Sequence, residues 1–181
     1  MATTNWNIDA SHSEVSFKVR HLMISNVRGN FTKFNASVTT EDDAFETAKI
    51  TFEAEAASVT THSEQRDAHI KSPDFFDIEK YPTLKFVSTR MEKTGENAYA
   101  LHGDLTINAT TKPVQFTVAM QGLGKDPWGQ TKAGFEVSGK INRTDFGLVW
   151  NAPLETGGLL VSEEVSLHAD VQFVKAVPAS A

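Results

Sequence analysis

The stretch that decides the fold is SEVSFKVRHLMISNVRGNF, residues Ser13–Phe31. Val15, Phe17 and Val19 alternate with polar residues in its first half, and the apolar face then continues to His21. Alternation with a period of two predicts a half-buried β-strand with one apolar and one solvated face. The sequence therefore raises the question of what this strand encloses, its own side chains or a ligand.

The same alternation recurs along the rest of the chain. Together with the opening strand, about eight strands are predicted, and the others fall at residues 31–38, 48–58, 83–88, 99–107, 114–120, 133–141 and 160–174. Turn-forming residues at 94–97, 110–113 and 122–130 predict hairpin loops and hence consecutive antiparallel strands. Eight such strands with one apolar face can close into an all-β barrel, which removes exposed sheet edges.

One segment, TTHSEQRDAHIKSPDFFDIEKYP at residues 60–82, lacks this alternation. Thr61 and Glu64 have the spacing of a capping box, and Pro73 disfavours continuation of a helix. We predict a helix from about His62 to Lys71, followed by an irregular aromatic stretch. This short helical insertion could cover one end of the barrel.

The length of 181 residues suits one domain, 1–181, with a core at about 6–174 and a frayed tail at 175–181. The formal net charge of −6 does not favour nucleic acid or an anionic membrane as a partner. There is no cysteine, so disulfides and thiolate chemistry are excluded.

The N-terminal residues do not resemble a secretory signal, and no apolar run is long enough for a membrane span. We therefore expect a cytoplasmic protein without stable membrane insertion. A periplasmic or secreted protein would be expected only if the sequence is a processed form.

Small residues on the predicted inner faces permit two interpretations. They leave room for a ligand, or they accommodate the taper and bends of a packed barrel. The residues concerned are Ala54, Ala56, Gly103, Ala133, Gly139 and Ala169.

No sequence motif indicates catalysis, a metal or a cofactor. The chain contains no nucleophile elbow, phosphate loop or dinucleotide fingerprint. His62 and His69 would lie about 10 Å apart along a helix, too far to chelate one ion. Arg66, Asp67 and His69 could form an acid/base cluster or ordinary helix-surface pairs.

Two further polar features also permit a structural interpretation. His21 continues an apolar face, so it is either a satisfied residue at the barrel end or an anchor for a ligand. Arg143 and Asp145 could form a pair that anchors a turn.

Four fragments, at residues 6–31, 66–86, 103–116 and 141–151, occur in the order found in the YceI-like, polyisoprenoid-binding family, and the chain resembles that family over about residues 6–173. The resemblance implies an extended, lipocalin-like barrel with an elongated apolar pore. Family members hold a long-chain lipid, such as a polyisoprenoid, an isoprenoid quinone or a fatty-acid amide. Some are exported, and many form homodimers, so a homodimer is a candidate assembly here.

Alternation, position and the resemblance together predict a non-catalytic protein that binds, sequesters or transports a long-chain isoprenoid or related lipid. Arg66 and His69 are the predicted contacts of a polar head group. The predicted pore residues are Val15, Phe17, Val19, His21, Phe31, Phe52, Phe75, Phe76, Tyr81, Phe86, Phe116, Phe135, Phe146, Trp150 and Phe173.

Two alternatives compete with this hypothesis. One is an enzyme acting on an isoprenoid or fatty amide through His21 or the Arg66–Asp67–His69 cluster. The other is a filled structural barrel that serves protein interaction.

Overall fold

The structure is a computed structural model that describes residues 2–22, 24–152 and 160–177. Its strands form one antiparallel sheet, and a single α-helix, α1 (Glu64–Lys71), is present among the described residues. The strands are β1 (Thr3–Ile8), β2 (Glu14–His21), β3 (Ser25–Phe31), β4 (Phe34–Glu41), β5 (Ala44–Glu55), β6 (Val59–Thr60), β7 (Thr83–Gly95), β8 (Ala98–Ile107), β9 (Thr110–Lys125), β10 (Thr131–Asn142) and β11 (Val161–Lys175).

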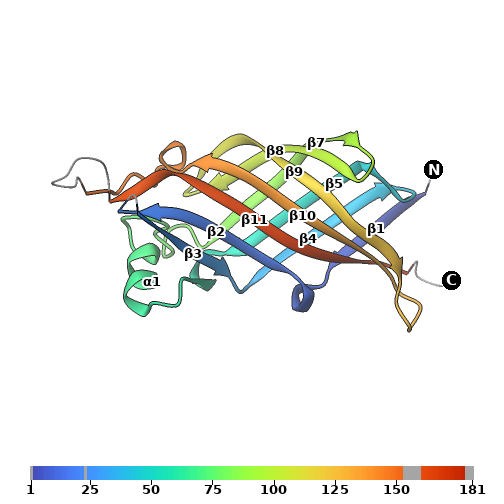
Figure 1. Ribbon diagram of the computed structural model, residues 1–181, viewed down its shortest axis with the longest axis horizontal. Helices are drawn as coiled ribbons and strands as arrows, with labels where there is room; N and C mark the ends of the chain where they lie inside the picture. The colour runs from blue at the N-terminus through green and yellow to red at the C-terminus, as the bar shows by residue number, and fades with distance from the viewer. Residues whose placement is uncertain (1, 23, 153–159, 178–181) are drawn as a thin grey trace.

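The sheet closes on itself. Its ring follows the order β1-β4-β5-β7-β8-β9-β10-β11, and β11 pairs again with β1, with Ile8 opposite Phe173. Figure 1 shows the elongated barrel with its strands steeply inclined to the long axis. The predicted eight-stranded antiparallel barrel with a short helical insertion is therefore confirmed.

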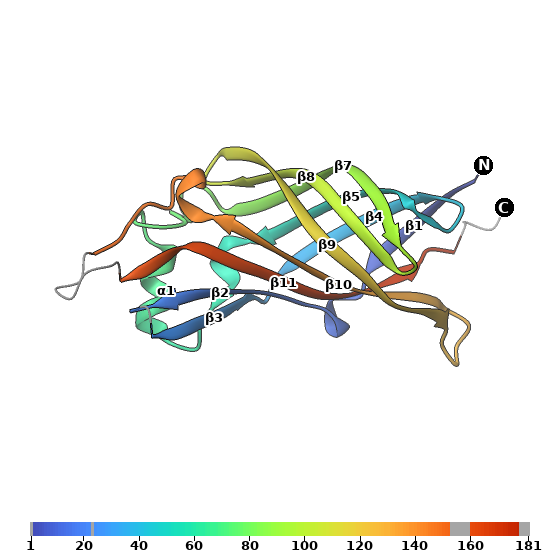
Figure 2. The same ribbon diagram turned by 45° about the horizontal axis from the view of Figure 1, so that its top comes forward.

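The predicted opening strand is found as β2, and the structure adds a strand, β1, before it. β1 and β2 run alongside successive parts of β11 and are separated by a short 3-10 helix at Ala10–His12. The N-terminal part, β1, was not predicted because only Trp6 and Ile8 are apolar in TTNWNI. β2 and β3 form a hairpin that reaches the end of the barrel where α1 lies (Figure 2).

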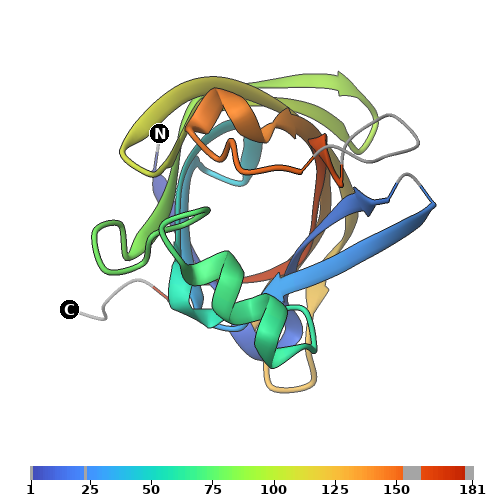
Figure 3. The same cartoon turned by 90° about the vertical axis from the view of Figure 1, so that its left-hand side faces the viewer.

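The helical insertion begins two residues later than predicted. Ser63 is the N-cap, and its Oγ accepts a hydrogen bond of 3.3 Å from the amide of Arg66. The predicted capping box is wrong, because Thr61 is buried and its hydroxyl donates to Asp67 instead. α1 lies across one end of the ring of strands, as the view along the barrel shows (Figure 3).

Two of the predicted turns also differ. Residues 110–113 belong to β9, and the turn before them consists of Asn108 and Ala109, both with positive φ. The predicted loop at 122–130 is shorter, because β9 continues to Lys125 and β10 begins at Thr131. The predicted tail begins inside β11, where Lys175 pairs with Trp6, and residues 178–181 lie outside the described residues.

Aromatic side chains fill the end of the barrel opposite α1. The indole of Trp6 is fully buried, lies 5.0 Å from the ring of Phe45, and donates a 3.1 Å hydrogen bond to Thr40 Oγ1. Phe45 in turn lies 5.0 Å from Phe135, which contacts Phe173 at 6.3 Å. Because these buried rings contact one another in series, we call this cluster the aromatic plug (Trp6, Phe45, Phe135, Phe173).

Glycines on the inner faces give space to phenylalanines. A Cβ at Gly103 would collide with the ring of Phe86, and one at Gly139 would lie 2.6 Å from Cδ1 of Phe116. The small residues at these two positions therefore allow close aromatic packing and do not leave a void. Ala54 and Ala169, in contrast, border open space inside the barrel.

Replacing Trp6 with alanine should destabilise the barrel by about 3–5 kcal/mol, because the substitution leaves a large cavity in a fully buried site. Trp128→Ala is the matched control, since this indole is 83% exposed. Urea unfolding measures both changes. Equal losses for the two variants would contradict the importance of the plug.

Gly103→Ala should destabilise the protein by about 1–3 kcal/mol through overpacking against Phe86 and the backbone of Val87. Gly122→Ala is the control, because a Cβ there meets no atom within 4 Å. Its stability should be unchanged or slightly increased. Thermal unfolding of the two variants distinguishes these outcomes, and an unaffected Gly103→Ala protein would refute the close packing.

Candidate functional site

The barrel interior holds two adjoining cavities. Chamber 1 has a volume of about 200 Å³ and extends to the aromatic plug, and chamber 2 has a volume of about 250 Å³ and lies under α1. Their walls share four residues, Phe31, Leu84, Ile107 and Leu167, which we call the neck. The two chambers therefore lie next to each other and meet at these four residues.

Chamber 1 is apolar. Among the described residues of its wall only Ser16 and His168 are polar, and the rest are aliphatic or aromatic. Such a wall offers a ligand almost no hydrogen bonds and excludes charged groups, because an unpaired buried charge is costly. This compartment can accept only hydrocarbon.

Chamber 2 contains the polar groups. Its wall includes His21, Arg66, His69 and Arg143 among apolar residues of β2, β3, α1 and β11, and the described wall residues include no carboxylate. Arg66 is exposed to solvent and His69 is half-buried, so this chamber meets solvent beneath α1. We call this region the mouth (Arg66, His69, Phe75, Trp150).

Arg143 is 3% exposed and holds together the chain segments around chamber 2. It follows β10 in a 3-10 helix at Arg143–Phe146, capped by the side chain of Asn142. Burial lowers the pKa of its guanidinium, although the negative charge of Glu163 opposes that effect. Its four hydrogen bonds are donated to the backbone carbonyls of Leu148, Trp150, Val161 and Ser162.

The predicted pairing of Arg143 with Asp145 is not what anchors this turn. Backbone carbonyls take the hydrogen bonds of the guanidinium, and no ion pair joins the two side chains within the described part of the chain. The guanidinium also lies 5.8 Å from the ring centre of Phe75.

The side chains of Arg66, Asp67 and His69 do not form one cluster, because His69 bonds to a different partner from the other two. Asp67 accepts hydrogen bonds from the amide and hydroxyl of Thr61, at 2.8 and 2.5 Å, and Arg66 donates to the same residue. His69 points the other way, and its Nε2 lies 2.9 Å from Asp74 Oδ2. An acid/base pair of Asp67 with His69 is therefore not formed.

Aromatic rings surround His69 at the mouth. Its ring lies 4.6 Å from the indole of Trp150 and 5.1 Å from Phe75, both edge to face. Trp150 and Phe75 also contact each other at 5.6 Å. α1 is thus packed to the loop after β10 by a small aromatic cluster and is not buried on any side.

Most of the predicted pore residues lie in the two chamber walls. Their contact with a ligand stays a prediction. The wall of chamber 1 includes Val15, Phe31, Phe52, Phe86, Phe116, Phe135 and Phe173. The wall of chamber 2 includes Phe17, Val19, His21, Phe31, Phe75, Phe76 and Trp150, together with Arg66 and His69. Tyr81 and Phe146 lie in neither wall.

Several wall residues were missed by the sequence analysis. Phe45 and Met91 line chamber 1 but are out of phase with apolar residues of their own strands such as Ile50 and Leu84, so strict alternation does not identify them. Ile107 lies in the neck and on a predicted inner face, but it was not among the predicted pore residues. The burial of Arg143 could not be predicted, because nothing in the local sequence INRTDFG indicates that its side chain is buried.

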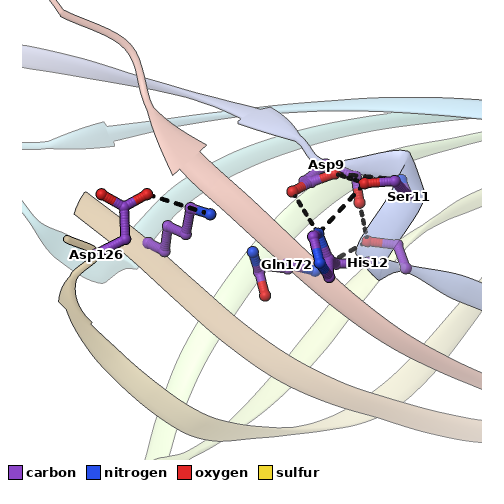
Figure 4. Close-up of polar contacts among 7 residues, drawn as sticks. Asp9, Ser11, His12, Asp126 and Gln172 are labelled. Atoms are coloured by element: carbon purple, nitrogen blue, oxygen red, sulfur yellow. Dashed lines mark hydrogen bonds and ion pairs between the residues drawn. The ribbon is translucent and has the colours of Figure 1, made fainter. Parts of the chain in front are cut away.

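A serine, a histidine and an aspartate also meet outside the pore, at the break between β1 and β2 (Figure 4). Asp9 accepts from the Ser11 hydroxyl at 2.6 Å and lies 2.8 Å from His12 Nδ1, while Ser13 Oγ accepts from the amide of Gln172 at 3.0 Å. The serine contacts the carboxylate directly and approaches the same Nδ1 of the histidine, so no relay from serine through histidine exists. This cluster caps the 3-10 helix at Ala10–His12.

Searches for a metal site and for a membrane span found no candidate among the described residues. No three His, Asp or Glu side chains gather there in a way that could hold a metal ion. No described helix has the length and apolar character needed to cross a bilayer.

The barrel and its pore agree with what comparisons with known proteins show. The model of the YceI-like domain matches residues 6–173. The chain belongs to the YceI-like family. A UPF0312 protein of Pseudomonas putida is 41% identical over 167 residues, which cover 92% of this chain and 83% of the relative.

Solved structures show the same fold. The YceI protein of Campylobacter jejuni superimposes with a TM-score of 0.77 at 31% identity, covering 93% of this chain and 96% of the other. A polyisoprenoid binding domain from Saccharophagus degradans superimposes with a TM-score of 0.69 at 12% identity, covering 94% and 98%. This second likeness concerns the fold alone.

Asp67→Asn should loosen α1. Partial burial raises the pKa of the Asp67 carboxyl, but hydrogen bonds from Thr61 outweigh this effect, so its pKa lies below the usual value. The bonds therefore stabilise the fold above the unfolded pKa of about 3.9, and this stabilisation is lost as the pH falls through the lowered folded value.

Hydrogen exchange across α1 measures the effect. The free energy of local opening should fall by about 1–3 kcal/mol in Asp67→Asn, the range for hydrogen bonds to a charged group. Asp104→Asn, on the exposed face of β8, is the control and should exchange like the wild type. Unchanged protection of α1 in the Asp67 variant would contradict this role of the carboxylate.

Proposed function

We propose that the protein binds one long-chain amphiphilic lipid, such as a polyisoprenoid or an isoprenoid quinone, and sequesters or carries it. The observation that carries the proposal is the polarity of the pore, because chamber 1 is lined almost entirely by apolar residues and the arginines lie in the wall of chamber 2. A hydrocarbon chain would fill chamber 1, and its polar head would lie in chamber 2. Membership of the YceI-like family and the fold likeness to a polyisoprenoid binding domain support the proposal.

The size of the barrel favours a chain longer than an ordinary acyl chain. β11 has 15 residues, and at about 3.3 Å per residue and a tilt of about 40° it spans roughly 35–40 Å along the axis. Half of a bilayer's hydrocarbon core, which accommodates one acyl chain, is about 15 Å thick. A prenyl chain of several units uses such a pore more fully.

The driving force is removal of apolar surface from water. Burial contributes roughly 0.8 kcal/mol for each CH₂ before the costs of binding. With about 0.3 kcal/mol per atom as a net yield, a ligand of about forty heavy atoms would gain ~12 kcal/mol, which corresponds to nanomolar affinity. Phe116 and Phe86, whose rings meet at 5.5 Å in chamber 1, provide a preformed wall.

Catalysis on such a lipid is the weaker candidate. His69 is the only imidazole in the described mouth, and its Nε2 is engaged by Asp74. His21 lies in the wall of chamber 2, but the described residues place no serine, threonine or carboxylate beside it in that wall. A binding function needs none of these groups.

Native mass spectrometry of freshly purified protein, followed by organic extraction, tests the proposal. A stoichiometric prenyl or acyl species is the expected result. A protein that is empty on isolation and after incubation with isoprenoid quinones and fatty amides would overturn it in favour of a filled barrel.

Leu84→Trp should block the neck. The larger side chain would separate chamber 2 from chamber 1, so we expect at least a tenfold loss of affinity for a prenyl chain of about forty carbons and a smaller loss for one of ten. Val87→Trp, on the same strand but 52% exposed, is the matched control and should bind both like the wild type. Equal affinity of all three proteins for the long chain would contradict a continuous pore, provided that circular dichroism shows folded variants.

A further inference from the structure

We infer that the mouth selects amphiphiles whose head group is an oxyanion, a carboxylate or a phosphate, over neutral heads on the same chain. This inference rests on the proposed function and adds the chemical class of the head. It is carried by the juxtaposition of two arginines in a chamber wall whose described residues include no acidic side chain, at the polar end of an otherwise apolar pore.

The distribution of charge is the first step. The chain has 23 acidic and 17 basic residues, yet neither chamber wall includes an aspartate or glutamate among its described residues, and the wall of chamber 2 includes two arginines and two histidines. Three carboxylates lie nearby but outside the described chamber walls. Asp67 is bonded to Thr61, Asp74 lies 52% exposed beside His69, and Glu163 is exposed on β11.

The second step concerns Arg143. A guanidinium has five N–H donors, and the carbonyls of the surrounding segments use four of them. Carbonyl dipoles satisfy hydrogen bonds but do not neutralise the charge, and the described residues contain no carboxylate within ion-pair distance of this side chain. The 97% buried guanidinium therefore lines the chamber without an ion pair among the described residues, and only the charge of the exposed Glu163 opposes the effect of its burial.

The third step concerns Arg66. Its Nε and Nη2 donate to Thr61 at 2.8 and 2.7 Å, which fixes the direction of the guanidinium at the rim. Its Nη1 has no hydrogen-bond partner among the described residues, and the side chain lines chamber 2. Planar guanidinium donors match the geometry of carboxylate and phosphate oxygens.

The two cations have different tasks in this arrangement. Arg143 supplies a buried, fixed positive potential at the inner side of the chamber, and Arg66 supplies exchangeable donors at the rim. A neutral head can use the same donors but gains nothing from the potential, and a cationic head is repelled by it. The mouth thus selects ligands by the charge of the head group, and the chambers select them by their hydrocarbon chain.

The test compares pairs of ligands that differ only in the head. Binding of the fluorescent fatty acid cis-parinaric acid is compared with binding of its methyl ester at pH 8, where the acid is ionised. Geranylgeranyl phosphate is compared with geranylgeraniol by displacement of the bound probe. We expect the anionic member to bind at least tenfold more tightly in one or both pairs, and the pair with the larger ratio identifies a carboxylate or a phosphate as the preferred head.

Arg66→Gln should reduce affinity for the anionic member about tenfold and affinity for the neutral member by less, so that the ratio of the two affinities falls. Arg90→Gln is the matched control, because this arginine is exposed on β7, pairs with Glu92 and lies in neither chamber wall. Arg66 is itself exposed, so the variant should fold, and circular dichroism verifies that it does.

The outcomes separate this inference from the proposed function. Equal affinity for anionic and neutral members in both pairs, or an Arg66→Gln protein that keeps the full preference, overturns selection by charge and leaves lipid binding intact. Failure of all four amphiphiles to bind the wild type overturns the proposed function as well.

Discussion

The pairing of β1 with β11 is the interaction on which the rest of the structure depends. It joins the two ends of the chain, with Trp6 opposite Lys175 and Ile8 opposite Phe173. Without it the ring of eight strands would be an open sheet with a long apolar face and two unpaired edges. With it, one face of the sheet becomes the lining of the barrel interior. The aromatic plug, in which Trp6 packs on Phe45, lies at one end of that interior.

Because the aromatic plug lies at one end of the barrel only, the two ends of the pore differ. The break at Ala10–His12 allows β2 and β3 to continue past the ring toward α1, and the same break is held by Asp9 and its neighbours. At that end Arg143 draws together the segment after β10 and the start of β11. The result is a dry compartment next to the plug and a compartment with arginines and histidines beneath a polar helix. A molecule with a long apolar chain and one polar end matches this order.

Much of the barrel could be predicted from the sequence because alternation is a local signal. Residues such as Val15, Phe52 and Phe116 reveal their inward direction through their immediate neighbours, and their positions in the chamber walls follow from it. The strand β1 was not predicted because asparagine and threonine dominate it. Its role in closing the barrel depends on pairing with residues that are far away in the sequence. The same limit applies to Arg143, whose burial depends on carbonyls up to 19 residues away.

The inner glycines and alanines show why the alternation pattern could not decide whether the barrel interior is filled or open. Gly103 and Gly139 are filled by neighbouring phenylalanine rings, whereas Ala54 and Ala169 border open space. The small inner residues therefore differ in role from one position to the next, and space for a ligand at the alanines stays a prediction. Tyr81 and Phe146 lie outside both chamber walls, because the segments that carry them are not strands and have no alternation that would fix their direction.

The central claim is that one extended chain occupies both chambers with its head at the mouth. Paramagnetic broadening in NMR spectra by stearic acid carrying a nitroxide near the head, or near the tail, tests it directly. The account predicts that the head label broadens the amide signals of His69 and Trp150, and that the tail label broadens those of Leu101 and Val118, which line chamber 1. Broadening confined to the outer face of the barrel, or identical for the two labels, would contradict it.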